Sequence, residues 1–132
     1  MEELINVGKR IPKMDAEEKV TGQAVYIHDL KIPGMLHGKI LYSSHPHAKI
    51  KSIDTSKAEK LPGVKAVLTG HNIPLIKFGF YKDNVPLKAN KVCSLRDEIA
   101  AVAATDPEIA EEALDLIKVE YDILPAVFDP EE

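Results

Sequence analysis

Four of the five histidines fall between His28 and His47, and imidazole is the commonest protein ligand for transition metals. In an extended segment, His45 and His47 are two residues apart, so their side chains would lie on one face and could share an ion. His28 and His37 supply no third ligand at a spacing typical of zinc sites. The alternative is a polar turn around Pro46 whose imidazoles hydrogen-bond to the backbone. We predict this turn and assign no metal ligand.

Two pairs of adjacent acids, Asp97-Glu98 and Glu111-Glu112, could be considered for general acid–base catalysis. Adjacent residues on a helix do not face each other, so the second pair is predicted to lie on a solvated surface. The first pair comes where a strand is expected to begin, and capping or edge protection explains it more simply. We therefore assign no catalytic role to either pair.

Cys93 is the only cysteine, and Arg96 nearby could favour its nucleophilic thiolate form. No histidine is adjacent in sequence, and a lone cysteine after an apolar residue such as Val92 is more often buried and inert. A single cysteine excludes an internal disulfide and a zinc or iron–sulfur site built from cysteines. A phosphate-binding loop is also missing, because the spacing and the following helix are wrong at Gly34, Gly38, Gly63 and Gly70.

Composition narrows the class of protein. The 132 residues carry 17 basic and 21 acidic side chains, a net charge of −4, and no Trp, which disfavours nucleic-acid binding. The longest strongly apolar stretch, Ile99 to Ala104, is far shorter than the roughly 20 residues that span a bilayer. The acidic start of the chain shows no signal peptide. We expect a cytoplasmic protein with no nucleic-acid or membrane partner.

The elements that must position these side chains are short. Residues 1–14 are predicted to form an extended arm, and 74–90 an ordered loop or edge hairpin. We expect helical segments at 15–19 and 54–61 and from Pro107 to Ile117, and strands at 24–27, 35–41, 48–53, 64–69, 99–104 and 118–121.

Alanine favours helix at Ile99–Ala104, but a short continuous apolar run followed by the helix start Thr105-Asp106-Pro107 favours a buried strand. Thr105 and Glu108 have capping-box spacing at the start of the last helix. The alternation of strands and helices predicts an α+β fold, a mixed sheet with helices packed on one side, in one domain over residues 15–132.

Several segments, in their order and spacing, resemble the molybdenum-binding subunit of the xanthine dehydrogenase and aldehyde oxidase family, at its N-terminal α/β-hammerhead domain. The segments are Val20–Ala24, Ser44–Ala48, Leu61–Val64, Asp97–Ala104 and Val119–Tyr121, within a match from about Val7 to Glu132. The stretch from Lys77 to Val92 is similar to the 4-hydroxybenzoyl-CoA reductase branch. Arg96 stands where the family usually has glycine, which implies a rebuilt turn or a different partner surface.

The resemblance implies a structural domain of a molybdenum-containing hydroxylase or dehydrogenase. Such an enzyme acts on an aromatic, aldehyde or aromatic CoA-thioester substrate, with water as the oxygen source. Its molybdenum–pterin cofactor, its iron–sulfur clusters and FAD would be held by other domains or subunits. This chain would bind no cofactor, and it would be inactive when isolated.

The implied partners are the remaining molybdenum-binding domains or subunit and the iron–sulfur and flavin subunits. We expect the partner-facing surface to be apolar and to lie around Phe78, Phe80 and Tyr81. The alternative is a stand-alone binding or assembly module without redox activity. An independent hydrolase would need a nucleophile–base pair that the sequence does not provide.

Overall fold

The computed structural model describes residues 7–129 and 131, and the chain divides into two units, residues 1–33 and 34–132. In the first unit, α1 (Ala16–Val20) and the 3-10 helix η1 (Ile27–Asp29) bury no residue. The strand predicted at 24–27 is wrong. The Tyr26 N–H donates to Asp29 Oδ2 at 2.9 Å, and this local capping bond favours a helical turn where no neighbouring strand is paired.

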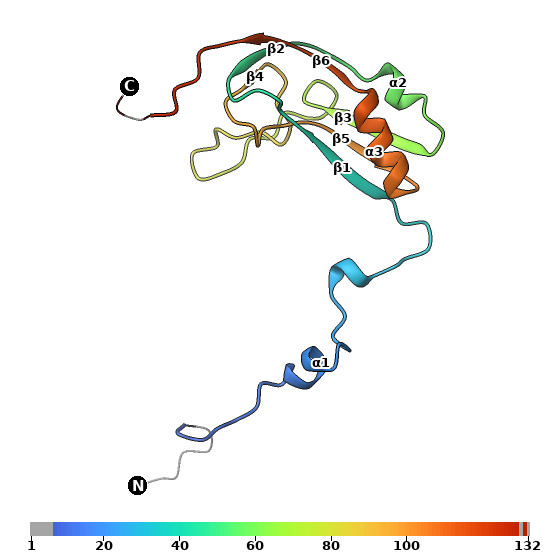
Figure 1. The fold of residues 1–132 in the computed structure, drawn as a ribbon, viewed down its shortest axis with the longest axis vertical. Helices are drawn as coiled ribbons and strands as arrows, with labels where there is room; N and C mark the ends of the chain where they lie inside the picture. The colour runs from blue at the N-terminus through green and yellow to red at the C-terminus, as the bar shows by residue number, and fades with distance from the viewer. Residues whose placement is uncertain (1–6, 130, 132) are drawn as a thin grey trace. The chain divides into compact units, whose positions relative to one another are not determined.

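The second unit, here called the sheet domain, contains two three-stranded antiparallel sheets (Figure 1). The first sheet has the order β1 (His37–Tyr42), β5 (Glu98–Ala104), β3 (Val64–Thr69), and the second has the order β4 (Lys91–Val92), β2 (Ala48–Asp54), β6 (Lys118–Ile123). Two helices, α2 (Ser56–Glu59) and α3 (Pro107–Leu116), complete the domain.

The predicted α+β class is confirmed, with the strands arranged in two antiparallel sheets rather than in one mixed sheet. The turn after β1 separates the sheets. There the Ser43 hydroxyl donates to His45 O at 2.7 Å and accepts from the His45 N–H at 3.1 Å. Pro46 follows and has no N–H for a ladder, so β2 starts a new sheet instead of continuing beside β1.

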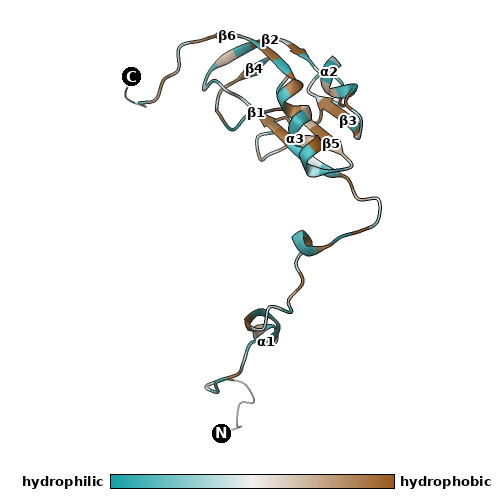
Figure 2. Ribbon diagram, turned by 45° about the vertical axis from the view of Figure 1, so that its right-hand side comes forward, coloured by the Kyte–Doolittle hydropathy of each residue, from teal (hydrophilic) through white to brown (hydrophobic). Residues whose placement is uncertain are grey.

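The main core lies between the first sheet and the helices. Val67 and Val102 project from the sheet towards Ala113 and Ile117 at the end of α3, and Ala58 of α2 completes the contact. Each buried valine contributes about 1.5–3 kcal/mol relative to an exposed one. Alanines at the contact allow the short helices to approach the sheet closely. Figure 2 shows hydrophobic residues along β3 and β5.

A second core joins the two sheets. Ile99 of β5 is fully buried and packs with Ala48 and Ile50 of β2 and with Val92 of β4. The segment Ile99–Ala104 is therefore a strand, as predicted, despite its alanines. As the central strand it pairs with β1 on one side and β3 on the other, which satisfies its backbone groups without a helix.

The start of α3 differs from the prediction by one residue. Asp106 is the N-cap, and its carboxylate accepts from the Glu108 N–H at 3.0 Å. Thr105, expected to cap the helix, instead donates its backbone N–H to Gly63 O at 3.0 Å. The backbone of Thr105 thus ties the end of β5 to the start of β3.

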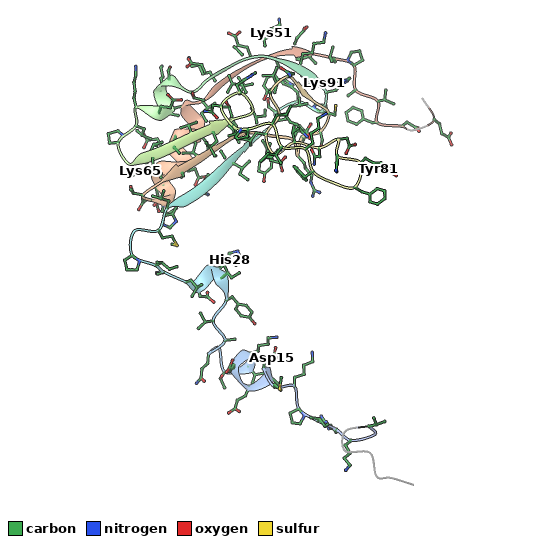
Figure 3. The ribbon with its side chains drawn as sticks, turned by 180° about the vertical axis from the view of Figure 1, so that it is seen from behind. Asp15, His28, Lys51, Lys65, Tyr81 and Lys91 are labelled. Carbon is green, nitrogen blue, oxygen red and sulfur yellow. The ribbon has the colours of Figure 1, made fainter. Side chains whose placement is uncertain are left out.

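Residues 74–90 contain a narrow hairpin, one of the two alternatives predicted. Phe78 and Asn84 exchange backbone hydrogen bonds of 3.0 and 3.4 Å. The tip carries Phe80 and Tyr81, which form an edge-to-face pair with ring centroids 5.1 Å apart. Both rings are exposed, at 94% and 82%, and Figure 3 shows Tyr81 pointing away from the ribbon. These aromatic side chains are thus accessible, and their role as a partner-facing surface stays a prediction.

No helix in the described part of the chain is long and apolar enough to cross a bilayer.

Candidate functional site

Several of the residues considered for chemistry meet at an open groove of about 590 Å³ in the sheet domain. Three segments form it: the turn before β2, the turn after β4, and the chain that follows β6. Its lining consists of Pro46, His47, Cys93, Ser94, Leu95, Arg96, Pro125, Ala126, Val127 and Phe128. His47 lines this groove together with Cys93 and Arg96. It lies more than 40 positions before the other two in the sequence, so their proximity could not be predicted from it.

The histidines hold the chain that follows β6. The His47 carbonyl accepts from the Leu124 N–H at 3.0 Å, and His47 Nδ1 lies 2.5 Å from Pro125 O, so the ring nitrogen donates there. The His45 ring packs edge-to-face on Tyr121, with centroids 4.9 Å apart. The bond from His47 to Pro125 O matches the predicted turn, in which imidazoles hydrogen-bond to the backbone, whereas the His45 ring packs on an aromatic ring instead.

The other two histidines considered as metal ligands lie elsewhere. His28 is in η1 of the first unit, and His37 is half-buried at the start of β1. Within residues 7–129 and 131, no three His, Cys, Asp or Glu side chains gather closely enough to hold a metal ion.

The turn after β4 is organised by Asp97. Its Oδ2 accepts from the Cys93 N–H at 2.6 Å and from the Ser94 N–H at 3.2 Å. The Arg96 N–H donates to Ser94 Oγ at 3.1 Å, and the Asp97 N–H donates to Ser94 O at 3.1 Å. Asp97 is therefore a turn-forming residue, in agreement with the capping interpretation of the Asp97-Glu98 pair.

Cys93 is exposed, so the preference for a buried cysteine is wrong, while its inertness stays a prediction. The physical reason is strand alternation: Val92 takes the inward position at the end of β4 and is fully buried, which turns Cys93 outward. The hydrogen bond recorded at Cys93 uses its backbone N–H. Because His47 Nδ1 is bonded to Pro125 O, that nitrogen does not serve as a base for the thiol.

The remaining acids are structural or solvated. Glu98 opens β5 opposite Tyr42. Glu111 and Glu112 are exposed on α3, as predicted, and Glu111 Oε2 lies 3.3 Å from Lys39 Nζ.

Perturbed ionisation is found at two helix starts outside the groove. Hydrogen bonds with Ser56 lower the pKa of Asp54, which precedes α2. Hydrogen bonds with Glu108 lower the pKa of Asp106, and the nearby charge of His37 acts in the same direction with a smaller effect. The Asp106 shift follows from its N-cap bond and the Asp54 shift from its bond to Ser56 just before α2, so neither marks a catalytic group.

Sequence reasoning missed the segment 125–128, which the pattern indicates only as the exit from the last strand. The signal available was an apolar pair, Val127-Phe128, directly after the strand-ending Pro125. The groove thus combines apolar side chains, the thiol of Cys93 and the guanidinium of Arg96. This lining suits contact with another polypeptide segment better than proton transfer.

Comparisons of the sequence and of the structure with known proteins agree on one family. Residues 21–125 match the family described as "Aldehyde oxidase and xanthine dehydrogenase, a/b hammerhead domain". The chain is 48% identical over 130 residues to a probable xanthine dehydrogenase subunit of Bacillus subtilis (strain 168). It is 43% identical over 127 residues to the nicotinate dehydrogenase large molybdopterin subunit of Eubacterium barkeri. The crystal structure of a Cu,Mo-CO dehydrogenase in its carbon monoxide reduced state superposes with a TM-score of 0.82 at 38% identity.

The matches cover this chain almost fully but cover little of the other proteins. They include 97% of this chain and 17% of the Bacillus subtilis protein, and 95% of this chain and 30% of the Eubacterium barkeri protein. The superposition includes 94% of this chain and 16% of the CO dehydrogenase chain.

Proposed function

The chain belongs to the aldehyde oxidase and xanthine dehydrogenase family, of which it is the a/b hammerhead domain, and we propose that it acts as a structural and not a catalytic part of a molybdenum-dependent oxidoreductase. The observation that carries this proposal is that side chains able to do chemistry are engaged in local structural contacts. His45, His47 and Asp97 are committed to holding turns and the chain after β6.

The residues of this chain do not fit an iron–sulfur cluster. Iron–sulfur clusters are held by several cysteine thiolates, whereas the whole sequence has one cysteine. The described residues also contain no cluster of metal-binding side chains. We therefore place the molybdenum–pterin cofactor, the iron–sulfur clusters and FAD on other domains or subunits, and we assign no chemical step to this chain. The isolated chain is expected to be inactive.

The parent reaction is proposed to be oxidoreduction of an aromatic, aldehyde or aromatic CoA-thioester substrate. The Eubacterium barkeri relative, named for nicotinate, supports an aromatic ring. The 4-hydroxybenzoyl-CoA reductase branch is a narrower proposal that rests on the stretch from Lys77 to Val92. The remaining molybdenum-binding part and the iron–sulfur and flavin subunits are the proposed partners, in the cytoplasm.

The experiment that tests this proposal is isolation of the natural protein through a tag on this chain, followed by molybdenum and iron analysis. We expect both metals, together with a polypeptide of the same family that is longer than the 14.6 kDa chain. A metal-free 14.6 kDa species without a partner would contradict the redox proposal. It would favour the alternative, a stand-alone binding or assembly module.

A further inference from the structure

We propose that the face of the first sheet turned away from α3, here called the open face, is the surface on which this domain docks onto the rest of a molybdenum-hydroxylase large subunit. The open face consists of Gly38, Ile40, Tyr42, Ala66, Leu68, Ala101 and Ala103. The inference rests on the proposed function and specifies the partner surface within it.

Strand alternation identifies the face. In β1, Leu41 packs in the main core and Lys39 meets Glu111 of α3, so the intervening Ile40 points to the other side. In β5, Ala100 and Val102 are buried beneath the helices. The alternating positions in the same central strand, Ala101 and Ala103, are only half-buried, although strands flank them on both sides. The sheet is therefore covered on one face and open on the other.

The register arranges the open face in rows. Ala101 pairs with Ile40 of β1 and with Leu68 of β3, which makes an apolar row across three strands. Ala103 pairs with Gly38 and Ala66, which makes a parallel row of small residues. The small row lets another chain approach the sheet closely, and Ile40 and Leu68, each 43% exposed, provide raised apolar edges beside it.

The chemistry of this face does not match a solvated sheet. Antiparallel sheets that face water usually place polar or charged side chains on that side. None of these seven residues is charged, and the tyrosine hydroxyl is their single side-chain polar group; the carboxylate of Glu98, which pairs with Tyr42, stands at the end of the face. Uncharged apolar surface of this kind marks an interaction site. The occupant must accordingly present an uncharged, mainly apolar surface.

The open face continues into the groove. Tyr42, at its end, is 50% exposed and borders a hollow of about 520 Å³ together with Leu95, Arg96 and Glu98. Leu95 and Arg96 also line the groove at Cys93. The guanidinium of Arg96 forms no ion pair within the part of the chain that the structure describes. One extended surface thus runs from the small-residue row to Arg96, with the charges of Glu98 and Arg96 at its margin.

The length of the related proteins favours the rest of the same subunit as the occupant of the open face. This domain superposes on a CO dehydrogenase chain of which it covers 16%, and it aligns with 17% of the Bacillus subtilis relative. Most of such a subunit therefore lies outside the hammerhead domain and is available to cover the open face. A second copy of this chain is the competing occupant.

The test is a labelling footprint at Leu68→Cys, made in a Cys93→Ser background in both the isolated 132-residue chain and the natural assembly. Maleimide labelling of the peptide that contains residue 68 is followed by mass spectrometry. We expect labelling in the molybdenum-containing assembly to be about tenfold slower or more, because the site is covered. Ser52→Cys, at an exposed position of β2, is the matched control for reagent access.

The outcomes separate the two proposals. Equal labelling rates at residue 68 in an assembly that contains molybdenum overturn the open-face proposal and leave the proposed function intact. Absence of any molybdenum-containing assembly overturns both. Slow labelling of an isolated chain that sediments as a dimer assigns the face to a second copy and overturns the proposal as stated.

Discussion

The glycines of the sheet domain differ in the space around them. A Cβ at Gly70 would lie 2.7 Å from Leu87 O and 2.8 Å from Ala89 N, both backbone atoms of the loop before β4. A Cβ at Gly38 would meet only Val102 O, at 3.9 Å, which is ordinary contact. The absence of a side chain at Gly70 therefore allows the loop to pack against the end of β3.

Gly70→Ala is expected to reduce the free energy of unfolding by about 1–3 kcal/mol, because neighbouring backbone must move to admit the methyl group. Urea denaturation monitored by circular dichroism measures the loss. Gly38→Ala is the matched control and should leave stability within about 0.5 kcal/mol. Equal midpoints for Gly70→Ala and the wild type would show that the loop can shift without cost.

The N-cap of α3 gives a pH-dependent prediction. Because hydrogen bonds lower the pKa of Asp106 in the folded protein, its ionised form stabilises the fold at pH values above the unfolded pKa, about 4. This contribution is lost as the pH falls through the lowered folded value. Relative to Asp106→Asn, the wild type should therefore have a higher Tm at pH 7, and the difference should shrink below about pH 4.

Calorimetry of both proteins from about pH 7 to about pH 3 spans the range in which the carboxyl changes its charge. Asp122→Asn, on an exposed part of β6, serves as the control for a general change in charge. A Tm difference between wild type and Asp106→Asn that grows as the solution is acidified would contradict the expected stabilisation by the ionised cap.

At the scale of elements, sequence patterns were most reliable where burial is periodic. The strand at Val64–Thr69 was predicted with its observed ends, and the run from Ile99 to Ala104 was assigned correctly because a short continuous apolar run before a helix start favours a buried strand. The prediction at 24–27 failed since a short apolar alternation does not make a strand without a neighbour. Register, and hence the division into two sheets, depends on contacts between residues far apart in sequence.

The candidate site was predictable only in part. The polar turn at His45 and His47 and the turn role of Asp97 followed from local chemistry. The exposure of Cys93 did not, because it depends on which face of β4 meets the core through Val92. The approach of His47 to Cys93 and Arg96 likewise required the pairing of β2 with β4 and β6.

The turn from Cys93 to Asp97 supplies a prediction at this scale. Asp97→Ala removes the acceptor of two backbone N–H groups and should reduce the free energy of unfolding by about 1–3 kcal/mol. Asp97→Asn keeps one acceptor oxygen and should lose less. Chemical denaturation of both variants, with Asp122→Ala as the control, measures the order. Equal losses for the alanine and asparagine variants would show that the side-chain oxygen does not hold the turn.

At the scale of the whole molecule, the two units predict a pattern of proteolysis. The first unit buries no residue in α1 or η1, so trypsin should cut early at Lys13, Lys19 and Lys31. We expect a resistant fragment that begins at Ile32, identified by mass spectrometry. Lys49, within β2 and paired with Lys91 of β4 and Asp122 of β6, should be cut much later, because paired backbone resists cleavage.

A different result would favour the sequence-based boundary. A stable fragment beginning at Met14 would support an arm over residues 1–14 and a folded domain from residue 15, which remains our prediction from sequence. The position of the first stable cut thus decides between the two divisions of the chain.

The strand order has a consequence for how the protein folds. β1 pairs with β5, and β2 pairs with β6, so in both sheets the early strand pairs with a strand that lies far along the sequence. Closing such long loops costs entropy before contacts compensate, which slows folding relative to helical proteins of similar size. During synthesis, neither sheet can be completed until β5 and β6 have left the ribosome. The unpaired edges of β1 and β2 are exposed until then, and a chaperone that shields extended apolar segments would raise the yield of the native protein.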